Sequence, residues 1–131
     1  MAAAVATVSV LDERSSWVAG NKYFVEGTIS ISASTATYTT GGIACSFLQP
    51  LIKVTRTPVL VQVQGQGVGT TGTLFEYRYV PGVDASAGLL KIFTGGAGSA
   101  AGLAEFTSLG AIPADVSTDT ITFIAIFNGM N

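Results

Sequence analysis

Short segments in which apolar and polar residues alternate, separated by glycine-rich turns, run through almost the whole chain. The segment 23–32 shows the pattern best, with Tyr23, Val25 and Ile29 on one face and polar residues on the other. A period of two residues is typical of a half-buried β-strand. No window shows the sustained 3.6-residue apolar repeat of an amphipathic helix. The chain is therefore expected to fold almost entirely as β-sheet.

The remaining strand candidates follow one another at short spacing, between turns that 16 glycines and four prolines supply. They cover residues 43–47, 51–55, 59–64, 74–80, 89–93, 105–109 and 120–127. Many short strands with frequent turns are typical of a sandwich or barrel. The gaps are glycine loops and supply no long helices, which excludes a parallel βαβ architecture. We expect a single all-β domain, an antiparallel β-sandwich of jelly-roll type, in which 74–80 and 89–93 form a hairpin.

The alternation also predicts the core and the division of the chain. Residues 1–20 are expected to be an N-terminal arm and lead-in, and residues 21–131 the sandwich domain. The start of the chain is apolar but lacks a basic segment, which favours a flexible or docking arm over a signal peptide. No apolar run approaches the roughly 20 residues of a membrane span. The residues expected to be largely buried are Ile29, Ile31, Val59, Val61, Val63, Tyr77, Ile92, Ile121 and Phe123.

The charge content constrains function. Only 11% of the 131 residues are charged, and the net charge is −2, whereas about 25% is usual for soluble domains. A chain with no basic field is poorly suited to nucleic acid. A low charge content also weakens the electrostatic repulsion that normally opposes association between protein molecules. We therefore expect part of the surface to be covered by a partner, through contacts that are mostly apolar and respond weakly to salt.

The residues that most enzymes and metal sites need are missing. The chain has no histidine and one cysteine, Cys45, which excludes an intrachain disulfide, a His/Cys zinc site and catalysis by a histidine base. The glycine loop 65–72 lacks the Lys-Ser/Thr ending of a phosphate-binding loop. The carboxylates show no diagnostic spacing. We expect no enzymatic activity, no cofactor and no metal, with Cys45 as a small core residue.

Partner contacts are expected in the N-terminal arm, at the single tryptophan and in the two glycine loops. Trp17 could anchor a partner or stack on a sugar, and packing at the edge of the sandwich is the structural alternative. The glycine loops are the candidates for adaptable contacts. The predicted contact residues are Ala2, Val5, Val8, Val10, Trp17, Gly67, Val68, Gly69, Gly96 and Leu103.

Three pairs of segments, in this order, resemble the capsid decoration or cement proteins of tailed bacteriophages. The first pair is Val25-Glu-Gly-Thr-Ile-Ser-Ile31 with Tyr38-Thr-Thr-Gly-Gly42. The second is Phe75-Glu-Tyr-Arg-Tyr79 with Gly88-Leu-Leu-Lys-Ile-Phe93. The third is Ala111-Ile-Pro-Ala-Asp115 with Ile121-Thr-Phe-Ile-Ala-Ile126. None of these segments is catalytic, and the chain departs from the family in being unusually poor in charge.

The resemblance implies a virion structural protein with a jelly-roll-like fold. Such a protein would sit on the outer surface of the capsid, act as a homodimer or homotrimer, and stabilise the head by bridging subunits of the major capsid protein. Neither nucleic acid nor membrane would be a partner. The alternative left open by the aromatic residues is a carbohydrate- or receptor-binding module of a phage tail.

Overall fold

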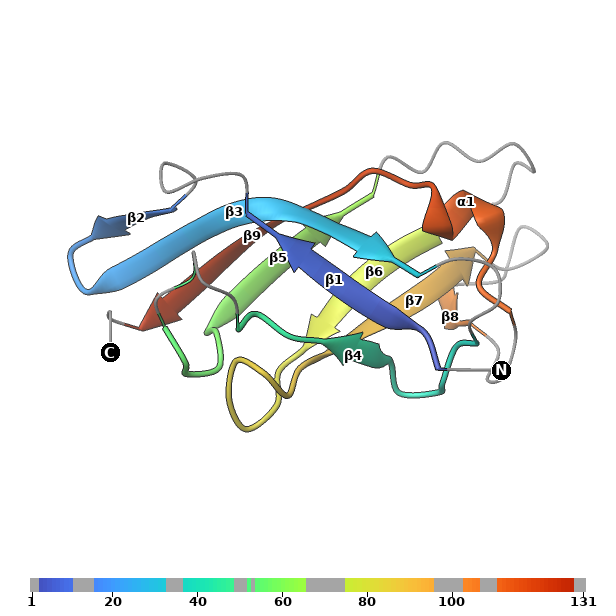
Figure 1. Ribbon diagram of the computed structural model, residues 1–131, viewed down its shortest axis with the longest axis horizontal. Coiled ribbons are helices and arrows are strands. Elements are labelled where there is room, and N and C mark those ends of the chain that lie inside the picture. The colour runs from blue at the N-terminus through green and yellow to red at the C-terminus, as the bar shows by residue number, and fades with distance from the viewer. Residues whose placement is uncertain are drawn as a thin grey trace.

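The computed structural model describes residues 3–10, 16–32, 37–48, 52, 54–65, 75–95, 103–106 and 111–128. These residues form nine strands and one short helix (Figure 1). The elements are β1 (Val5–Ser9), β2 (Ser16–Ala19), β3 (Lys22–Ile31), β4 (Ile43–Cys45), β5 (Leu60–Gln64), β6 (Phe75–Val80), β7 (Leu89–Gly95), β8 (Leu103–Glu105), α1 (Ala114–Ser117) and β9 (Ile121–Asn128).

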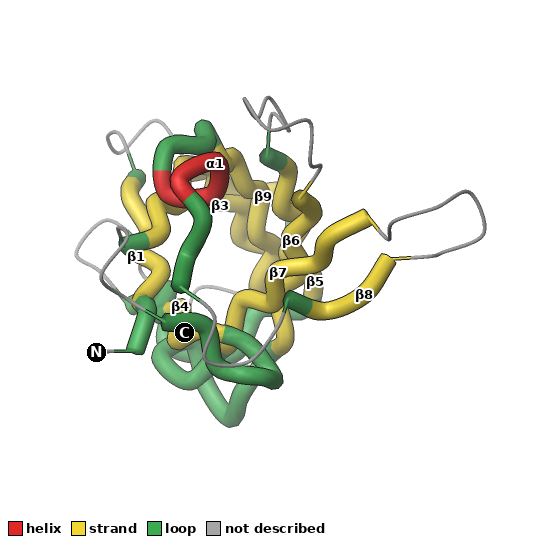
Figure 2. The backbone as a smooth tube through the Cα atoms, turned by 90° about the vertical axis from the view of Figure 1, so that its right-hand side faces the viewer, coloured by secondary structure: helices red, strands yellow, loops and turns green. Residues whose placement is uncertain are grey.

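The nine strands belong to one sheet. Its order is β5-β9-β3-β1-β4-β7-β6, with β2 paired to β3 and β8 paired to β7. The pairing of β1 with β4 is parallel, and the other named pairs are antiparallel. The sheet curls so that β5 and β6, its two ends, come into contact, and Figure 2 shows the strands arranged around a ring. No ladder joins these two strands in the described residues, so the barrel is nearly closed.

The prediction of a single all-β domain is confirmed, and so is the hairpin of β6 with β7. A jelly-roll sandwich is not shown, because the described strands follow one another in a single mixed sheet. The sheet was expected to be wholly antiparallel, and the parallel pair of β1 with β4 departs from that expectation.

The interior of the barrel holds one continuous apolar core. Phe47, which follows β4, is fully buried at its centre. Its ring centroid lies 5.1 Å from those of Tyr79 and Phe123 and 6.3 Å from that of Phe127, all in edge-to-face arrangements. Cys45 is also fully buried, as expected of a core residue. Burial raises the pKa of its thiol to about 12.

The prediction of largely buried residues is confirmed for six of the nine. Ile29, Ile31, Tyr77, Ile92, Ile121 and Phe123 are buried, and Val61 and Val63 are half-buried against the core. The prediction was wrong for Val59, which is 52% exposed. It precedes β5 at the end of the barrel, where its amide donates to the Ile126 carbonyl, 2.8 Å away. The alternation of apolar and polar residues in the sequence continues beyond the last position at which a side chain can reach the core.

The N-terminal segment contributes two strands within the range expected to be an arm and lead-in. β1 and β2 lie one after the other along the same side of β3. Between the partners of β1 and of β2 on β3 lies Gly27. The register of β3 with β9 runs through Gly27 without interruption. A Cβ there would collide with the Ser9 carbonyl and the Phe123 ring, so glycine permits a close approach of β1.

Three local expectations differ from the structure. The described residues of the expected strand 51–55 lie outside any strand, although Val54 is fully buried. The strand expected over 105–109 is β8, which ends at Glu105. The helix α1 lies in a stretch expected to be a loop, where the amides of Val116 and Ser117 donate to the Pro113 carbonyl.

Candidate binding surfaces

A row of four apolar side chains crosses the outer face of the sheet. Trp17 of β2 lies opposite Phe24 of β3, Phe24 lies opposite Ile126 of β9, and Ile126 lies opposite Leu60 of β5. Directly opposed residues have Cβ atoms about 4.5–5.5 Å apart, so the four side chains are neighbours. We call these four residues the outer apolar row.

The two ends of the outer apolar row are its most accessible parts. Trp17 is 42% exposed and Leu60 is 54% exposed, while Phe24 and Ile126 between them are half-buried. The rings of Trp17 and Phe24 are stacked, with centroids 5.3 Å apart and planes inclined by 3°. This stacking fixes the orientation of the indole. The row therefore presents a preformed apolar surface to solvent.

Polar residues lie beside the row on both sides, with one half-buried apolar residue, Ile124, among them. On one side Lys22 of β3 lies opposite Asn128 of β9, and its Nζ hydrogen-bonds the Asn128 side chain. On the other side Glu26 of β3 lies opposite Ile124 of β9, which in turn lies opposite Gln62 of β5. An apolar centre with a polar border is the usual anatomy of a protein-binding surface.

The strand β2 extends this surface beyond the barrel. In Figure 1 it lies at the end of the molecule away from α1, alongside one half of β3 only. Val18 in this strand is 51% exposed. In the described part of the chain β2 pairs with no strand other than β3. Open strand edges are sites where another chain can add.

The predicted contact residues divide between surface, core and undescribed segments. Trp17 and Val5 are exposed, at 42% and 50%. Val8 is half-buried against the core, and Val10 is buried, because the apolar side chains of β1 and its flanks serve the barrel interior. Leu103 lies in β8, and its side chain is not described. The predictions for Ala2, Gly67, Val68, Gly69 and Gly96 lie outside the described residues.

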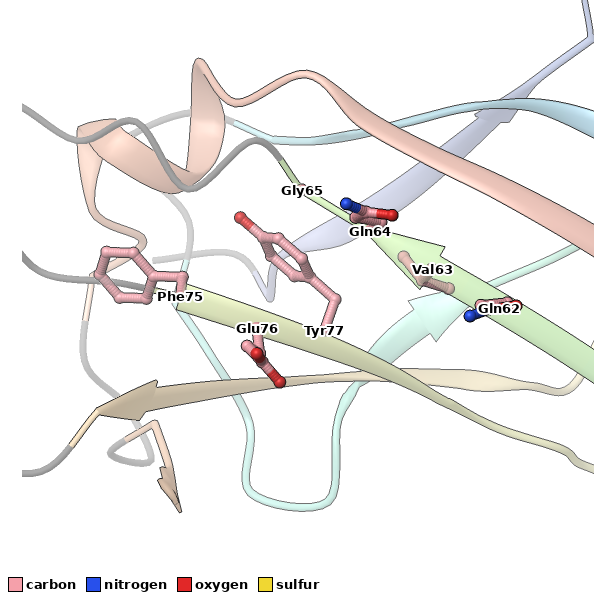
Figure 3. A pocket seen from close by; sticks show the side chains of 7 residues that line it. All are labelled: Gln62, Val63, Gln64, Gly65, Phe75, Glu76 and Tyr77. Carbon is pink, nitrogen blue, oxygen red and sulfur yellow. The ribbon is translucent and has the colours of Figure 1, made fainter. Parts of the chain in front are cut away.

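A second feature is a groove of about 380 Å³ between β5 and β6, where the barrel remains open (Figure 3). Gln62, Gln64 and Glu76 line it with exposed polar side chains, and Phe75 and Tyr77 supply aromatic rings. Figure 3 shows the Tyr77 side chain directed from β6 toward β5.

Two contacts hold the Tyr77 ring in place. Its hydroxyl donates a hydrogen bond to Asp119 Oδ2, 2.9 Å away. Burial and this bond to the carboxylate raise the pKa of Tyr77 well above its usual range. Gly65, at the end of β5, lies against the ring so closely that a Cβ there would collide with it. The groove thus has one rigid wall.

A third polar feature ties β8 to the barrel. The Tyr38 hydroxyl donates to Glu105 Oε2 at 2.5 Å, and the Gly41 amide donates to the same oxygen at 2.6 Å. These bonds from Tyr38 and Gly41 hold the pKa of the Glu105 carboxyl below its usual range. Burial, together with the bond to Glu105, raises the pKa of Tyr38 well above its usual range. Both donors converge on one oxygen of Glu105, so these bonds hold β8 against the segment that contains Tyr38 and Gly41.

Sequence reasoning found Trp17 but missed its partners in the row. The signal was present in part: the last strand is apolar on both faces, which is unusual for a half-exposed sheet. The pairing register, which the sequence does not reveal, is what brings Trp17, Phe24, Ile126 and Leu60 into line.

Comparison of the chain with protein-family models, with curated proteins and with solved structures gave no match. No group of three or more metal-ligating side chains occurs in the described residues. None of the helices in that part of the chain has the length and apolarity to cross a membrane.

Proposed function

We propose that the chain is a capsid decoration protein of a tailed bacteriophage, which stabilises the head by binding its outer surface and bridging subunits of the major capsid protein. The observation that carries this proposal is the outer apolar row. A surface with exposed tryptophan and leucine, on a protein with 11% charged residues, favours a permanently bound protein partner. The resemblance of the sequence to decoration proteins supplies the identity of that partner.

The proposed mechanism is binding without chemistry. A ligand that binds only the assembled shell stabilises it by mass action. Many equivalent copies allow modest affinities to sum, because each bridge makes the next contact intramolecular in effect. The role does not depend on the jelly-roll topology that the resemblance implies, since it requires only an accessible apolar surface on a rigid sheet.

Self-association is part of the same proposal. A homodimer or homotrimer would cover apolar surface that a monomer leaves exposed. Among the described strands β2 pairs with β3 alone, and Trp17 of β2 belongs to the outer apolar row. Sedimentation of the purified chain at micromolar concentration checks this part. A single stable monomeric species, found also as isolated copies on the head, would contradict it.

The decoration role is tested on heads of the phage that encodes the chain, prepared without it and then reloaded. We expect reloaded heads to rupture at a higher temperature than bare heads, with little change across ionic strength. Trp17→Ser and Leu60→Ser should remove the gain. Val83→Ser is the matched control, because Val83 is 91% exposed and lies outside the row. Equal rupture temperatures for bare and reloaded heads would refute the role.

The binding surface has its own criterion. A stabilisation that disappears on adding salt would leave the decoration role in place and refute the apolar contact, since screening acts on charges. A carbohydrate- or receptor-binding module of a phage tail remains the alternative prediction, and location of the chain on the tail instead of the head would favour it.

A further inference from the structure

The groove between β5 and β6 combines polar side chains with aromatic rings, and we propose that it binds a neutral saccharide. Its volume of about 380 Å³ falls within the roughly 300–1,000 Å³ of small-molecule sites. The outer apolar row is a different surface, formed by other residues. This inference therefore does not rest on the decoration role.

The polar side chains of the groove match the chemistry of hydroxyl groups. A carboxamide such as that of Gln62 or Gln64 both donates and accepts hydrogen bonds, and so does a sugar hydroxyl. Glu76 offers carboxylate acceptors from the facing strand. Within the described part of the chain, no hydrogen bond engages the side chain of Gln62 or of Glu76.

The charge of the lining disfavours an anion. Glu76 is the one ionisable carboxylate in the described lining, and no lysine or arginine is part of it. A phosphate or an acidic sugar would meet a negative charge with nothing to compensate for it. A neutral ligand avoids that cost.

The aromatic residues supply the apolar half of a sugar site. Phe75 and Tyr77 both lie on β6 and line the groove. In Figure 3 the Tyr77 side chain is directed toward β5, and the Phe75 ring lies beyond it, farther from Gln62 and Gln64. The C–H face of a pyranose ring is apolar and can pack on the half-buried Phe75 ring, whereas Tyr77 is only 7% exposed and forms the base of the groove. The bond from Tyr77 to Asp119 holds its ring in place before any ligand arrives. A preformed wall lowers the entropic cost of binding.

The same ring disfavours an added peptide strand as the occupant. A strand that closed the barrel would pair along β5, whose end at Gln64 directly precedes Gly65. The Tyr77 ring already lies against Gly65 there. A ligand the size of one or two sugar rings needs only the part of the groove between Gln62 and Glu76.

The test uses the full chain, labelled with ¹⁵N, and follows its backbone amide signals by NMR. The probes are lactose, maltotriose, cellotriose and N,N′-diacetylchitobiose, with sialic acid as an acidic comparison. We expect saturable shifts in β5 and β6 for at least one neutral probe, with a dissociation constant of about 1 mM or tighter. Sialic acid should bind more weakly than that probe.

Variants locate the site. Gln62→Ala and Glu76→Gln should each weaken binding by about 2- to 10-fold, the equivalent of one hydrogen bond. Both residues are exposed, so the spectrum outside the groove should stay unchanged. Ser30→Ala, an exposed change on β3 away from the groove, should leave the affinity unaltered.

Several results would overturn the proposal. The first is the absence of saturable shifts with every neutral probe. The second is shifts centred on Trp17 instead of on β5 and β6. The third is equal weakening by Ser30→Ala. An uncharged extended decapeptide that shifts β5 and β6 while no sugar does so would also overturn it, in favour of strand addition.

Discussion

Replacing three buried tyrosines by phenylalanine, one at a time, should change stability in a fixed order. Each change removes a hydroxyl and leaves the ring. Tyr38 is fully buried and donates to Glu105 Oε2 at 2.5 Å. A hydrogen bond to a charged group contributes about 1.5–3 kcal/mol, so Tyr38→Phe should cost an amount in that range. Tyr77→Phe loses the longer bond to Asp119, 2.9 Å, and should cost about 1.5 kcal/mol, the lower end of that range.

Tyr79→Phe is the matched control for this series. The Tyr79 hydroxyl is buried and has no hydrogen-bond partner in the described residues. An unsatisfied buried hydroxyl keeps its desolvation cost without compensation. Burial raises the pKa of Tyr79 to about 12, consistent with an apolar surrounding. Removing the hydroxyl should leave stability unchanged or increase it by up to about 1 kcal/mol.

Urea unfolding at pH 7, followed by far-ultraviolet circular dichroism, measures the three effects. With a slope of about 1.5 kcal/mol per molar urea, the Tyr38→Phe midpoint should fall by about 1–2 M. The Tyr79→Phe midpoint should stay equal or rise. Comparable losses for Tyr38→Phe and Tyr79→Phe would refute the reasoning, since ring packing and not the hydroxyl would then decide the outcome.

The Tyr38 effect should also depend on pH, with a sign that follows from Glu105. The folded-state pKa of this carboxyl is lowered, chiefly by the bond from Tyr38. Its contribution is therefore fully present above the unfolded pKa of about 4.3 and is lost as the pH falls through the folded pKa. The gap between wild type and Tyr38→Phe should be widest at neutral pH and should narrow in acid. A gap that widened below pH 4 would contradict the assignment.

Three further outcomes follow from packing and backbone geometry. Phe47→Ala should cost about 3–5 kcal/mol in urea unfolding, as expected for a fully buried aromatic residue, whereas Leu48→Ala, at 47% exposure, should cost under about 0.5 kcal/mol. Gly42 and Gly20 both have positive φ, +122° and +63°. Gly42→Ala should destabilise the protein more than Gly20→Ala, because only the Gly42 position lacks room for a Cβ. Cys45 should resist iodoacetamide in the native protein and react once urea unfolds it, since its thiol is buried and its pKa is raised to about 12; rapid modification under native conditions would contradict that placement.

Much of the barrel could be predicted from local patterns because its strands bury one face. The alternation in β3 placed Tyr23, Val25 and Ile29 correctly inside, and β6 with β7 formed the expected hairpin. The pattern failed at Val59, where alternation persists beyond the end of the core. An alternation with a period of two indicates which face of the strand a residue lies on. It does not indicate where along the strand the core ends.

The N-terminal strands were missed for a different reason. The segment that contains β1 consists largely of alanine and valine, and small apolar residues without charged alternation carry a weak strand signal. β1 is specified by its neighbours: it pairs with β3 on one side and β4 on the other, both distant in sequence. The parallel pair with β4 could not be inferred from either segment alone. The outer apolar row also depends on pairing between segments distant in sequence, so it could not be inferred from any one segment.

The composition of β9 connects the fold to the proposed role. Its inward residues, among them Phe123 and Phe127, build the core, and its outward residue Ile126 stands at the centre of the outer apolar row. A strand used only for stability would carry polar residues on the outward side. Polar substitution of Ile126 should therefore affect binding more than folding, whereas Phe123→Ala should do the reverse. Separate effects of this kind on head rupture and on urea unfolding would show that the two faces of one strand serve two purposes, and equal effects on both would show that the outward face serves the fold alone.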